Sequence, residues 1–210
     1  MTRIVLVDDH EIVRRGIRGI LAEHAGFEVV GEAGDYPGLR RVLKETPADV
    51  VVMDIGLPGK SGIEILQGLG EEHPGLKVLM LSIYPEDQYG LRALKSGAAG
   101  YLNKASAPEE LVRAVETVAS GRKYVSPALA QALVDNLTGD ASESPHEKLS
   151  NREFQTLCLI ARGKRLSDIA DALALSPKTV SVYRARILEK MGLANNAELT
   201  HYALKHKLVD

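Results

Sequence analysis

Five polar residues stand at or just after the ends of short apolar runs. They are Asp8, Asp9, Asp54, Ser82 and Lys104. Three carboxylates brought together repel one another and raise each other's pKa, and a bound cation removes that conflict. Carboxylate and carbonyl oxygens suit a hard ion, and Mg²⁺ is the usual one in a cell. A nucleophilic carboxylate beside a metal, a hydroxyl and an ammonium suits phosphoryl transfer.

The elements that must position these residues are predicted by the apolar runs themselves. Those runs are rich in Val, Ile and Leu and lack polar alternation, which is typical of strands covered on both faces. Longer amphipathic segments separate them, so we expect a doubly wound, five-stranded parallel sheet of the flavodoxin-like α/β type. The runs are Ile4–Val7, Glu28–Val30, Val50–Met53, Val78–Leu81 and Ala98–Leu102.

In an open parallel sheet, ligands bind beyond the carboxyl ends of the strands, so the five polar residues should share one edge. A loop or helix-cap role would explain any single acid among them. It does not explain why all five stand at strand ends.

The pattern changes after residue 121. Residues 127–136 (PALAQALVDN) predict one more helix, and residues 138–148 (TGDASESPHEK) are small and polar, as in a linker. No strand-like run follows. We therefore expect a domain over 1–121, a linker helix and flexible linker over 122–148, and a small all-α domain over 149–210. Its helical segments fall near 150–162, 166–174, 177–191 and 196–206.

Helix-start signals are well marked in the last domain. Ser150 and Glu153 have the spacing of a capping box, and Ser167 is expected to cap the second helix. Ser176 followed by Pro177 gives an N-cap with proline at the first helical position. Two short helices joined by a brief turn predict a helix-turn-helix.

The outward face of the helix that starts at Pro177 carries small and mildly apolar residues, which is unusual for a solvated helix. It suits a helix in the DNA major groove, where Ser181, Val182 and Ala185 would meet base edges. The phosphate contacts expected on this helix are Lys178, Thr179, Arg184 and Arg186. A helical bundle that binds protein remains the alternative at this point.

Charge is distributed unevenly along the chain. Residues 149–210 hold 10 Lys and Arg against 6 Asp and Glu, whereas the residues before them hold 16 against 22. This asymmetry indicates that only the last part meets a polyanion.

Composition limits the cellular setting. No apolar run reaches the roughly 18 residues that span a bilayer, and the apolar segment in MTRIVLVDD is too short for a signal peptide. The single cysteine, Cys158, excludes an internal disulfide and fits a reducing compartment. We therefore expect a cytoplasmic protein with no membrane partner.

Residues 1–121 resemble the receiver domain of two-component response regulators. The segments VDD, MDIGLPGKSG, LS and GYLNK carry the resemblance, in the order and spacing of that family. It implies that Asp54 is the phosphoacceptor. The Mg²⁺ ligands that it implies are Asp8, Asp9, Asp54 and the backbone carbonyl of Gly56.

The resemblance also implies that Ser82 and Lys104 bind the phosphoryl group. In that family the hydroxyl residue moves toward the phosphate and an aromatic side chain turns inward, which makes Ser82 and Tyr101 the expected switch. One departure is Ile83, where the family often has alanine. We expect this bulk to slow phosphoryl exchange with small donors or water.

Residues 149–206 resemble the LuxR-type effector domain of the NarL/FixJ family. The matching pieces are LSNRE, SDIADAL, SPKTVSVYRARILEKMG and NNAEL. Tyr183 stands where many members have His, and Ser181 and Ala185 stand where many have Lys or Arg. The resemblance implies DNA binding without giving the target sequence. It also implies that the last helix, near 196–207, mediates dimerisation.

Together the resemblances imply a response regulator: a histidine kinase phosphorylates Asp54, and the change switches binding to promoter DNA and hence transcription. A homodimer is expected in the phosphorylated or DNA-bound state. The receiver would support only its own phosphorylation and dephosphorylation, so we do not expect an enzyme.

A phosphatase of the haloacid-dehalogenase type needs an acid two residues after the nucleophile, where this chain has Gly56. A DNA-binding protein whose receiver is never phosphorylated is disfavoured by the complete set of acids, Ser82 and Lys104.

Overall fold

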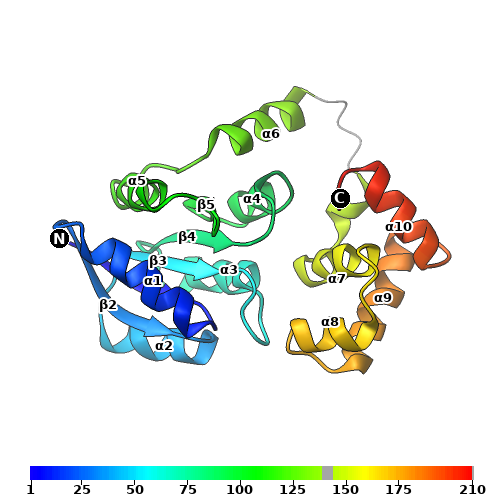
Figure 1. Ribbon diagram of the computed structural model, residues 1–210, viewed down its shortest axis with the longest axis horizontal. Coiled ribbons are helices and arrows are strands. Elements are labelled where there is room, and N and C mark those ends of the chain that lie inside the picture. The colour runs from blue at the N-terminus through cyan, green and yellow to red at the C-terminus, as the bar shows by residue number, and fades with distance from the viewer. Residues whose placement is uncertain (139–143, 210) are drawn as a thin grey trace. The chain divides into compact units, whose positions relative to one another are not determined.

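The computed structural model describes residues 1–138 and 144–209 (Figure 1). The chain divides into two compact units, Met1–Gly139 and Asp140–Asp210. Residues 139–143 of the expected linker lie outside the described residues. The helix expected within 122–148 is present as α6, Pro127–Thr138, and it belongs with the first unit.

The first unit is built on a five-stranded parallel sheet in the order β2-β1-β3-β4-β5. This order confirms the predicted doubly wound fold, because sequential strands are placed on both sides of β1. The strands are β1 Thr2–Val7, β2 Phe27–Ala33, β3 Val50–Asp54, β4 Lys77–Ser82 and β5 Gly100–Asn103. Every residue of β3 is buried, as expected for a central strand covered on both faces.

Helices follow the strands. They are α1 Glu11–Ala22, α2 Tyr36–Glu45, α3 Gly62–Glu72, α4 Glu86–Lys95 and α5 Pro108–Ala119. Helices α1 and α5 pack on one face of the sheet, where Leu21 and Val115 join Ile4 and Val52 in one apolar cluster. The sequence patterns identified no helix at α2. Its signal is Asp35, whose side chain accepts from the backbone N–H of Gly38 at the helix start.

Strand register brings the carboxyl ends of the strands to one edge. Val7 of β1 is paired with Met53 of β3, and Asp54 is paired with Leu81 of β4. Ser82 in turn is paired with Asn103 of β5. The residues that end β1, β3, β4 and β5 therefore lie in neighbouring positions.

The loop after β3 is held by the close approach of α3. Gly62 opens this helix, and a Cβ there would lie 2.3 Å from the backbone oxygen of Asp54, so only glycine fits. Ser61 and Glu64 form a reciprocal capping box at the same point. The helix start thus fixes the path of residues 55–61 beside Asp54.

The second unit contains helices and no strand among its described residues. Its elements are the 3₁₀ turn η1 Pro145–Lys148 and helices α7 Asn151–Ala161, α8 Leu166–Ala172, α9 Pro177–Met191 and α10 Asn196–Lys205. The capping box of Ser150 and Glu153 is present as predicted. No helix in the described part of the chain is long and apolar enough to cross a membrane.

The prediction that Ser167 caps the second helix is wrong. The N-cap of α8 is Arg165, without a side-chain cap bond, and the Ser167 hydroxyl donates to Asp168 instead. The physical reason is tertiary packing. Leu166 packs against the buried cluster of this unit, which starts the helix early enough to place Ser167 inside its first turn.

Candidate phosphoryl-transfer site and nucleic-acid interface

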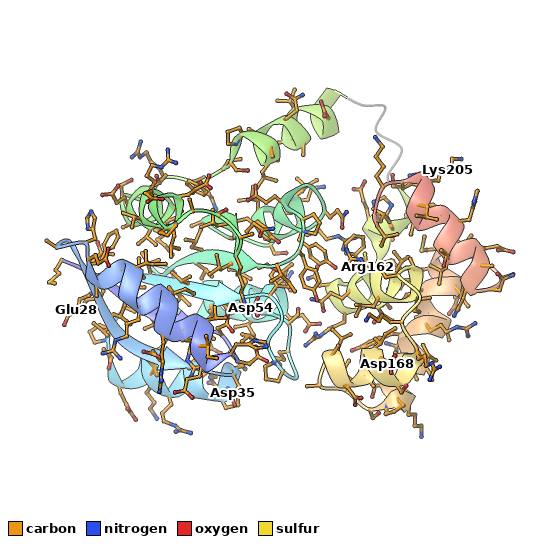
Figure 2. All side chains as sticks on the ribbon, viewed as in Figure 1. Glu28, Asp35, Asp54, Arg162, Asp168 and Lys205 are labelled. Atoms are coloured by element: carbon orange, nitrogen blue, oxygen red, sulfur yellow. The ribbon has the colours of Figure 1, made fainter. Side chains whose placement is uncertain are left out.

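The polar residues predicted at strand ends surround the carboxyl edge of the sheet. Asp54, labelled in Figure 2, ends β3 and is 6% exposed. Asp8 follows β1 and is 2% exposed, and Ser82 ends β4 with no exposure. Buried polar groups of this kind need partners.

Lys104 joins two of the carboxylates. Its Nζ lies 2.5 Å from Oδ2 of Asp8 and 3.0 Å from Oδ2 of Asp54. Burial raises the pKa of the Asp54 carboxyl, and the Lys104 ammonium only partly opposes this. Burial alone would lower the pKa of Lys104, but Asp54 and Asp8 outweigh it and the pKa is raised. Lys104 is thus held as an ammonium.

The acids at this edge fit a hard divalent cation. The Lys104 ammonium pairs with the carboxylates of Asp8 and Asp54, and the Asp9 carboxylate lies beside His10, so the three acids outnumber the one ammonium. The backbone N–H of Gly56 hydrogen-bonds to the Asp54 carboxylate, so the Gly56 peptide also lies at the site. These residues supply the oxygen-rich donor set that Mg²⁺ prefers.

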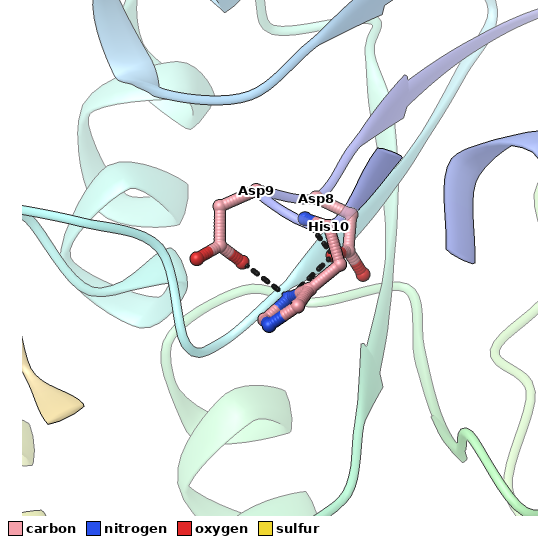
Figure 3. Close-up of side chains that lie close together, drawn as sticks. All are labelled: Asp8, Asp9 and His10. Carbon is pink, nitrogen blue, oxygen red and sulfur yellow. Dashed lines mark hydrogen bonds and ion pairs between the residues drawn. The ribbon is translucent and has the colours of Figure 1, made fainter. Parts of the chain in front are cut away.

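His10 follows the acid pair in the sequence, which allows either a place near a metal or a solvated loop position; in the structure it lies beside both acids with its side chain 68% exposed. Its Nδ1 is 2.8 Å from Oδ1 of Asp9 and 3.3 Å from Oδ1 of Asp8 (Figure 3). The three residues bring their potential ligand atoms within 4.8 Å of one another. The backbone N–H of His10 also donates to Oδ1 of Asp8 at 2.9 Å, which fixes the orientation of the Asp8 carboxylate.

Arg14 is a supporting residue that sequence reasoning missed. Its guanidinium donates to the backbone oxygen of Asp8 at 2.6 Å and pairs with Glu32 of β2 at 3.3 Å. It therefore anchors the end of β1 to the neighbouring strand. No local sequence pattern indicates this contact, because it depends on the pairing of β1 with β2.

Tyr101, the predicted switch residue, is fully buried. Its hydroxyl donates to the backbone oxygen of Tyr84 at 2.8 Å, and burial raises its pKa. The backbone N–H of Tyr84 donates to the Ser82 hydroxyl oxygen at 3.1 Å. The switch pair Ser82 and Tyr101 is therefore joined through the first turn after β4. Ile83 lies between Ser82 and Tyr84 in this turn. Its side chain is 72% exposed and therefore points toward solvent.

The helix-turn-helix of the second unit is formed by α8 and α9. The Ser176 side chain accepts from the backbone N–H of Thr179, and Pro177 opens α9. Gly192, with φ of 66°, ends it in the left-handed conformation. Val180 and Ile187 are fully buried, so the face of α9 that carries them packs inward.

The predicted outer face of α9 is available to solvent. Lys178, Ser181, Val182, Ala185 and Arg186 are exposed, whereas Thr179 and Arg184 are partly buried. Val182 is 42% exposed, so its methyl groups can contact an external surface.

Three of these side chains have partners within the unit. Arg184 Nε donates to Oδ1 of Asn196 at 2.6 Å, so it ties α9 to the start of α10. The Ser181 hydroxyl donates to the backbone oxygen of Pro177, and the hydroxyls of Thr179 and Ser176 lie 2.8 Å apart. Lys178, Val182, Ala185 and Arg186 are thus the residues best placed to meet an external surface.

Two protein families match the chain. The family described as "Response regulator receiver domain" matches residues 4–116. The family described as "Bacterial regulatory proteins, luxR family" matches residues 147–203.

Relatives match along the whole chain. Response regulator UvrY of Escherichia coli K12 is 38% identical over 209 residues, covering 99% of this chain and 96% of UvrY. Response regulator GacA of Pseudomonas protegens is 40% identical over 210 residues, covering 100% of this chain and 99% of GacA. A similar solved structure is that of RcsB from Salmonella enterica serovar Typhimurium, bound to the promoter rprA in the presence of the phosphomimetic BeF3-. It matches with a TM-score of 0.66 at 26% identity and covers 96% of this chain and 97% of the RcsB chain.

Proposed function

This chain belongs to the response regulators that join a receiver domain to a LuxR-type DNA-binding domain, and we propose that phosphorylation of Asp54 by a histidine kinase controls its binding to promoter DNA. One observation carries the proposal: the Lys104 ammonium bridges two buried carboxylates at the carboxyl edge of the sheet. A buried ion cluster of this kind is costly for stability and is better explained by chemistry at the site.

In the proposed transfer, an oxygen of the Asp54 carboxylate attacks the phosphorus of the phosphohistidine. The phosphorus–nitrogen bond breaks, the imidazole leaves with its electron pair, and an acyl phosphate forms on Asp54. Lys104 already touches the attacking carboxylate, so its ammonium can follow the phosphoryl oxygens with little movement. Nearly all the contribution of the protein is positioning and charge compensation.

Asp8, Asp9, Asp54 and the carbonyl of Gly56 are the residues that we propose hold Mg²⁺. Such an ion, when bound, neutralises charge on the phosphoryl oxygens. His10 and Lys104 contribute by orienting Asp8 and Asp9 before a cation arrives.

The proposed switch uses Ser82 and Tyr101. Ser82 binds the phosphoryl group through its hydroxyl, which alters the turn that Tyr84 shares with Tyr101. This is a local change in hydrogen bonding that biases a bistable segment.

The proposed DNA contacts fall on α9. Val182 and Ala185 would touch thymine methyl groups, Ser181 would bond a base edge, and Lys178 and Arg186 would meet phosphates. Thr179 and Arg184 complete the proposed set at the edge of the face. One solved RcsB structure is described as two dimers bound to two parallel DNAs, which supports binding of this chain as a homodimer.

The proposed activity is regulatory. The receiver would promote only its own phosphorylation and dephosphorylation, so no separate substrate is expected. Promoter DNA as the target supports the cytoplasm as the site of action.

The test compares DNA affinity before and after phosphorylation. Wild-type protein should bind a cognate promoter fragment more tightly after treatment with acetyl phosphate and Mg²⁺, and Asp54→Asn should show no such change. Equal affinity of phosphorylated and unphosphorylated wild-type protein would contradict the proposed control.

A further inference from the structure

A cavity lies at the edge of the sheet where the strands begin, here called the amino edge, opposite the edge that carries Asp54. Its volume is 670 Å³, within the range of roughly 300–1,000 Å³ that small-molecule sites occupy. It is lined by residues at the amino ends of β1, β3 and β4 and at the carboxyl ends of α2, α3 and α5. The apolar part of this lining, which suits the body of a small organic molecule, includes Leu43, Pro47, Leu76 and Ala119.

Bonds between the strand starts hold the cavity in shape. The backbone N–H of Asp49 donates to the backbone oxygen of Arg3 at 2.9 Å, and that of Lys77 donates to the backbone oxygen of Asp49 at 3.1 Å. The Arg3 guanidinium also donates to both oxygens of the Asp49 carboxylate, at 3.2 and 2.8 Å. These bonds from Arg3 lower the pKa of the Asp49 carboxyl to about 2. The one carboxylate among the described lining residues is therefore already paired with a cation.

Lys77 brings a positive charge to the cavity that no such pair neutralises. The residue is partly buried, and within the described part of the chain no ion pair joins it to a carboxylate. Burial lowers the pKa of the Lys123 ammonium, and the nearby Lys77 ammonium lowers it further. His73, partly buried at the end of α3, adds an imidazole that can donate a hydrogen bond. Neighbouring ammonium groups without a counterion favour a bound anion, as the acids at the other edge favour a cation.

We propose that this cavity binds a small organic acid, with its apolar body against Leu43 and Leu76 and its carboxylate or phosphate head on the Lys77 ammonium. The head accepts hydrogen bonds from Lys77 Nζ and from the His73 imidazole, and the charge on the partners strengthens them. The site is separate from the phosphoryl-transfer site, because parallel strands place their two ends at opposite edges of the sheet. The inference does not depend on phosphorylation of Asp54.

The test uses benzoate and phenyl phosphate as probes, with neutral benzamide for comparison. Each is titrated into the isotope-labelled full chain, and the amide chemical shifts are followed by NMR. At least one of the two acids should shift the amides of Leu76 and Ala119 saturably, and the tighter of them identifies the head. Benzamide should bind about 10-fold more weakly or worse, because it makes no charge-assisted contact.

Two pairs of variants locate the site. Lys77→Gln should weaken binding of the acids by about 10-fold or more, whereas Lys44→Gln removes an exposed charge of α2 outside the lining and should not change it. Gly75→Leu adds a side chain at a lining position where a Cβ meets no atom within 4 Å, so it should fold and still obstruct the cavity. Gly70→Leu is its control, equally open on α3 but outside the lining.

Any of three results would overturn the inference. The first is the absence of a saturable shift with either acid, or saturable shifts that map away from the amino edge. The second is benzamide binding as tightly as the acids. The third is wild-type affinity for the acids in both Lys77→Gln and Gly75→Leu. None of them bears on the proposed function, which fails instead if promoter affinity does not respond to phosphorylation of Asp54.

Discussion

The ammonium nitrogen of Lys104 lies 3.0 Å from Oδ2 of Asp54, with Asp8 at 2.5 Å on its other side. Lys104 comes from the end of β5 and Asp54 from the end of β3, with β4 between them. The two side chains therefore meet only because the strand order of the sheet places β3 and β5 on either side of β4. Lys104 places a fixed positive charge where a phosphoryl group on Asp54 would carry negative charge.

Lys104→Ala should slow phosphorylation of Asp54 by acetyl phosphate by about 10²-fold, the typical effect of removing one group that stabilises transition-state charge. The rate is measured on gels that separate phosphorylated protein. Lys44→Ala, at an exposed position of α2, is the control and should react at the wild-type rate. Equal rates for both variants would remove Lys104 from the mechanism.

Asp9→Asn should weaken Mg²⁺ binding by at least about 10-fold, because it removes a charged oxygen ligand from the proposed site. Isothermal titration calorimetry with MgCl₂ gives the affinity directly. Glu11→Gln changes a nearby exposed acid that pairs with Arg15 instead, and it should bind Mg²⁺ as the wild type does. An unchanged affinity in Asp9→Asn would place the cation elsewhere.

Ile83→Ala should shorten the lifetime of the phosphorylated protein severalfold. Ile83 follows Ser82 at the end of β4, and we expect its bulk, where the family often has alanine, to limit the approach of water to Asp54. Decay is followed after removal of the phosphodonor. Ile12→Ala removes another exposed isoleucine, 86% exposed on α1, and should leave the lifetime unchanged. A wild-type form that decays as fast as Ile83→Ala would contradict the proposed shielding.

Lys178→Ala should weaken binding to all DNA sequences alike and reduce the slope of log affinity against log salt concentration by about 1. Val182→Ala should instead reduce discrimination between cognate and unrelated DNA, because a methyl contact reads the base. Fluorescence anisotropy at several salt concentrations measures both effects. A Lys178→Ala variant with the wild-type salt slope would show that this face of α9 does not meet phosphates.

Glu153→Gln should lower the free energy of unfolding of the second unit by about 1 kcal/mol at neutral pH. Burial alone would raise the pKa of the Glu153 carboxyl, but the Lys190 ammonium 2.7 Å away and the Ser150 cap outweigh it, and the pKa is lowered. The contribution is therefore present above the ordinary glutamate pKa and disappears as pH falls through the lower, folded value.

Urea unfolding at neutral and at acidic pH checks this sign. The difference between wild type and Glu153→Gln should vanish at acidic pH, whereas Glu189→Gln, at an exposed position of α9, should match wild type throughout. A difference that grows on acidification would contradict the assignment.

The sequence predicted what depends on neighbours along the chain. Four apolar residues before Asp54 marked a buried strand, and the acid at its end marked the ligand edge. Ser150 and Glu153 form their capping box because both partners lie within one helical turn. Local signals of this kind survive into the folded structure when tertiary packing agrees with them.

Contacts that depend on register or on packing between helices were not accessible from the sequence. Ser126 and Glu86 are 40 residues apart and meet only because α6 lies on α4. The bond between Arg184 and Asn196 likewise joins two successive helices, α9 and α10, and no local pattern in the sequence indicates it. The Ser167 prediction failed because packing of Leu166 decided where α8 begins.

The central claim is that Asp54 accepts the phosphoryl group, and its most direct test is the intact mass of the full chain after incubation with acetyl phosphate and Mg²⁺. Wild-type protein should gain one phosphoryl group that hydroxylamine removes, as an acyl phosphate requires. Asp54→Asn, with an unchanged circular dichroism spectrum, should gain none. Equal phosphorylation of Asp54→Asn would contradict the claim.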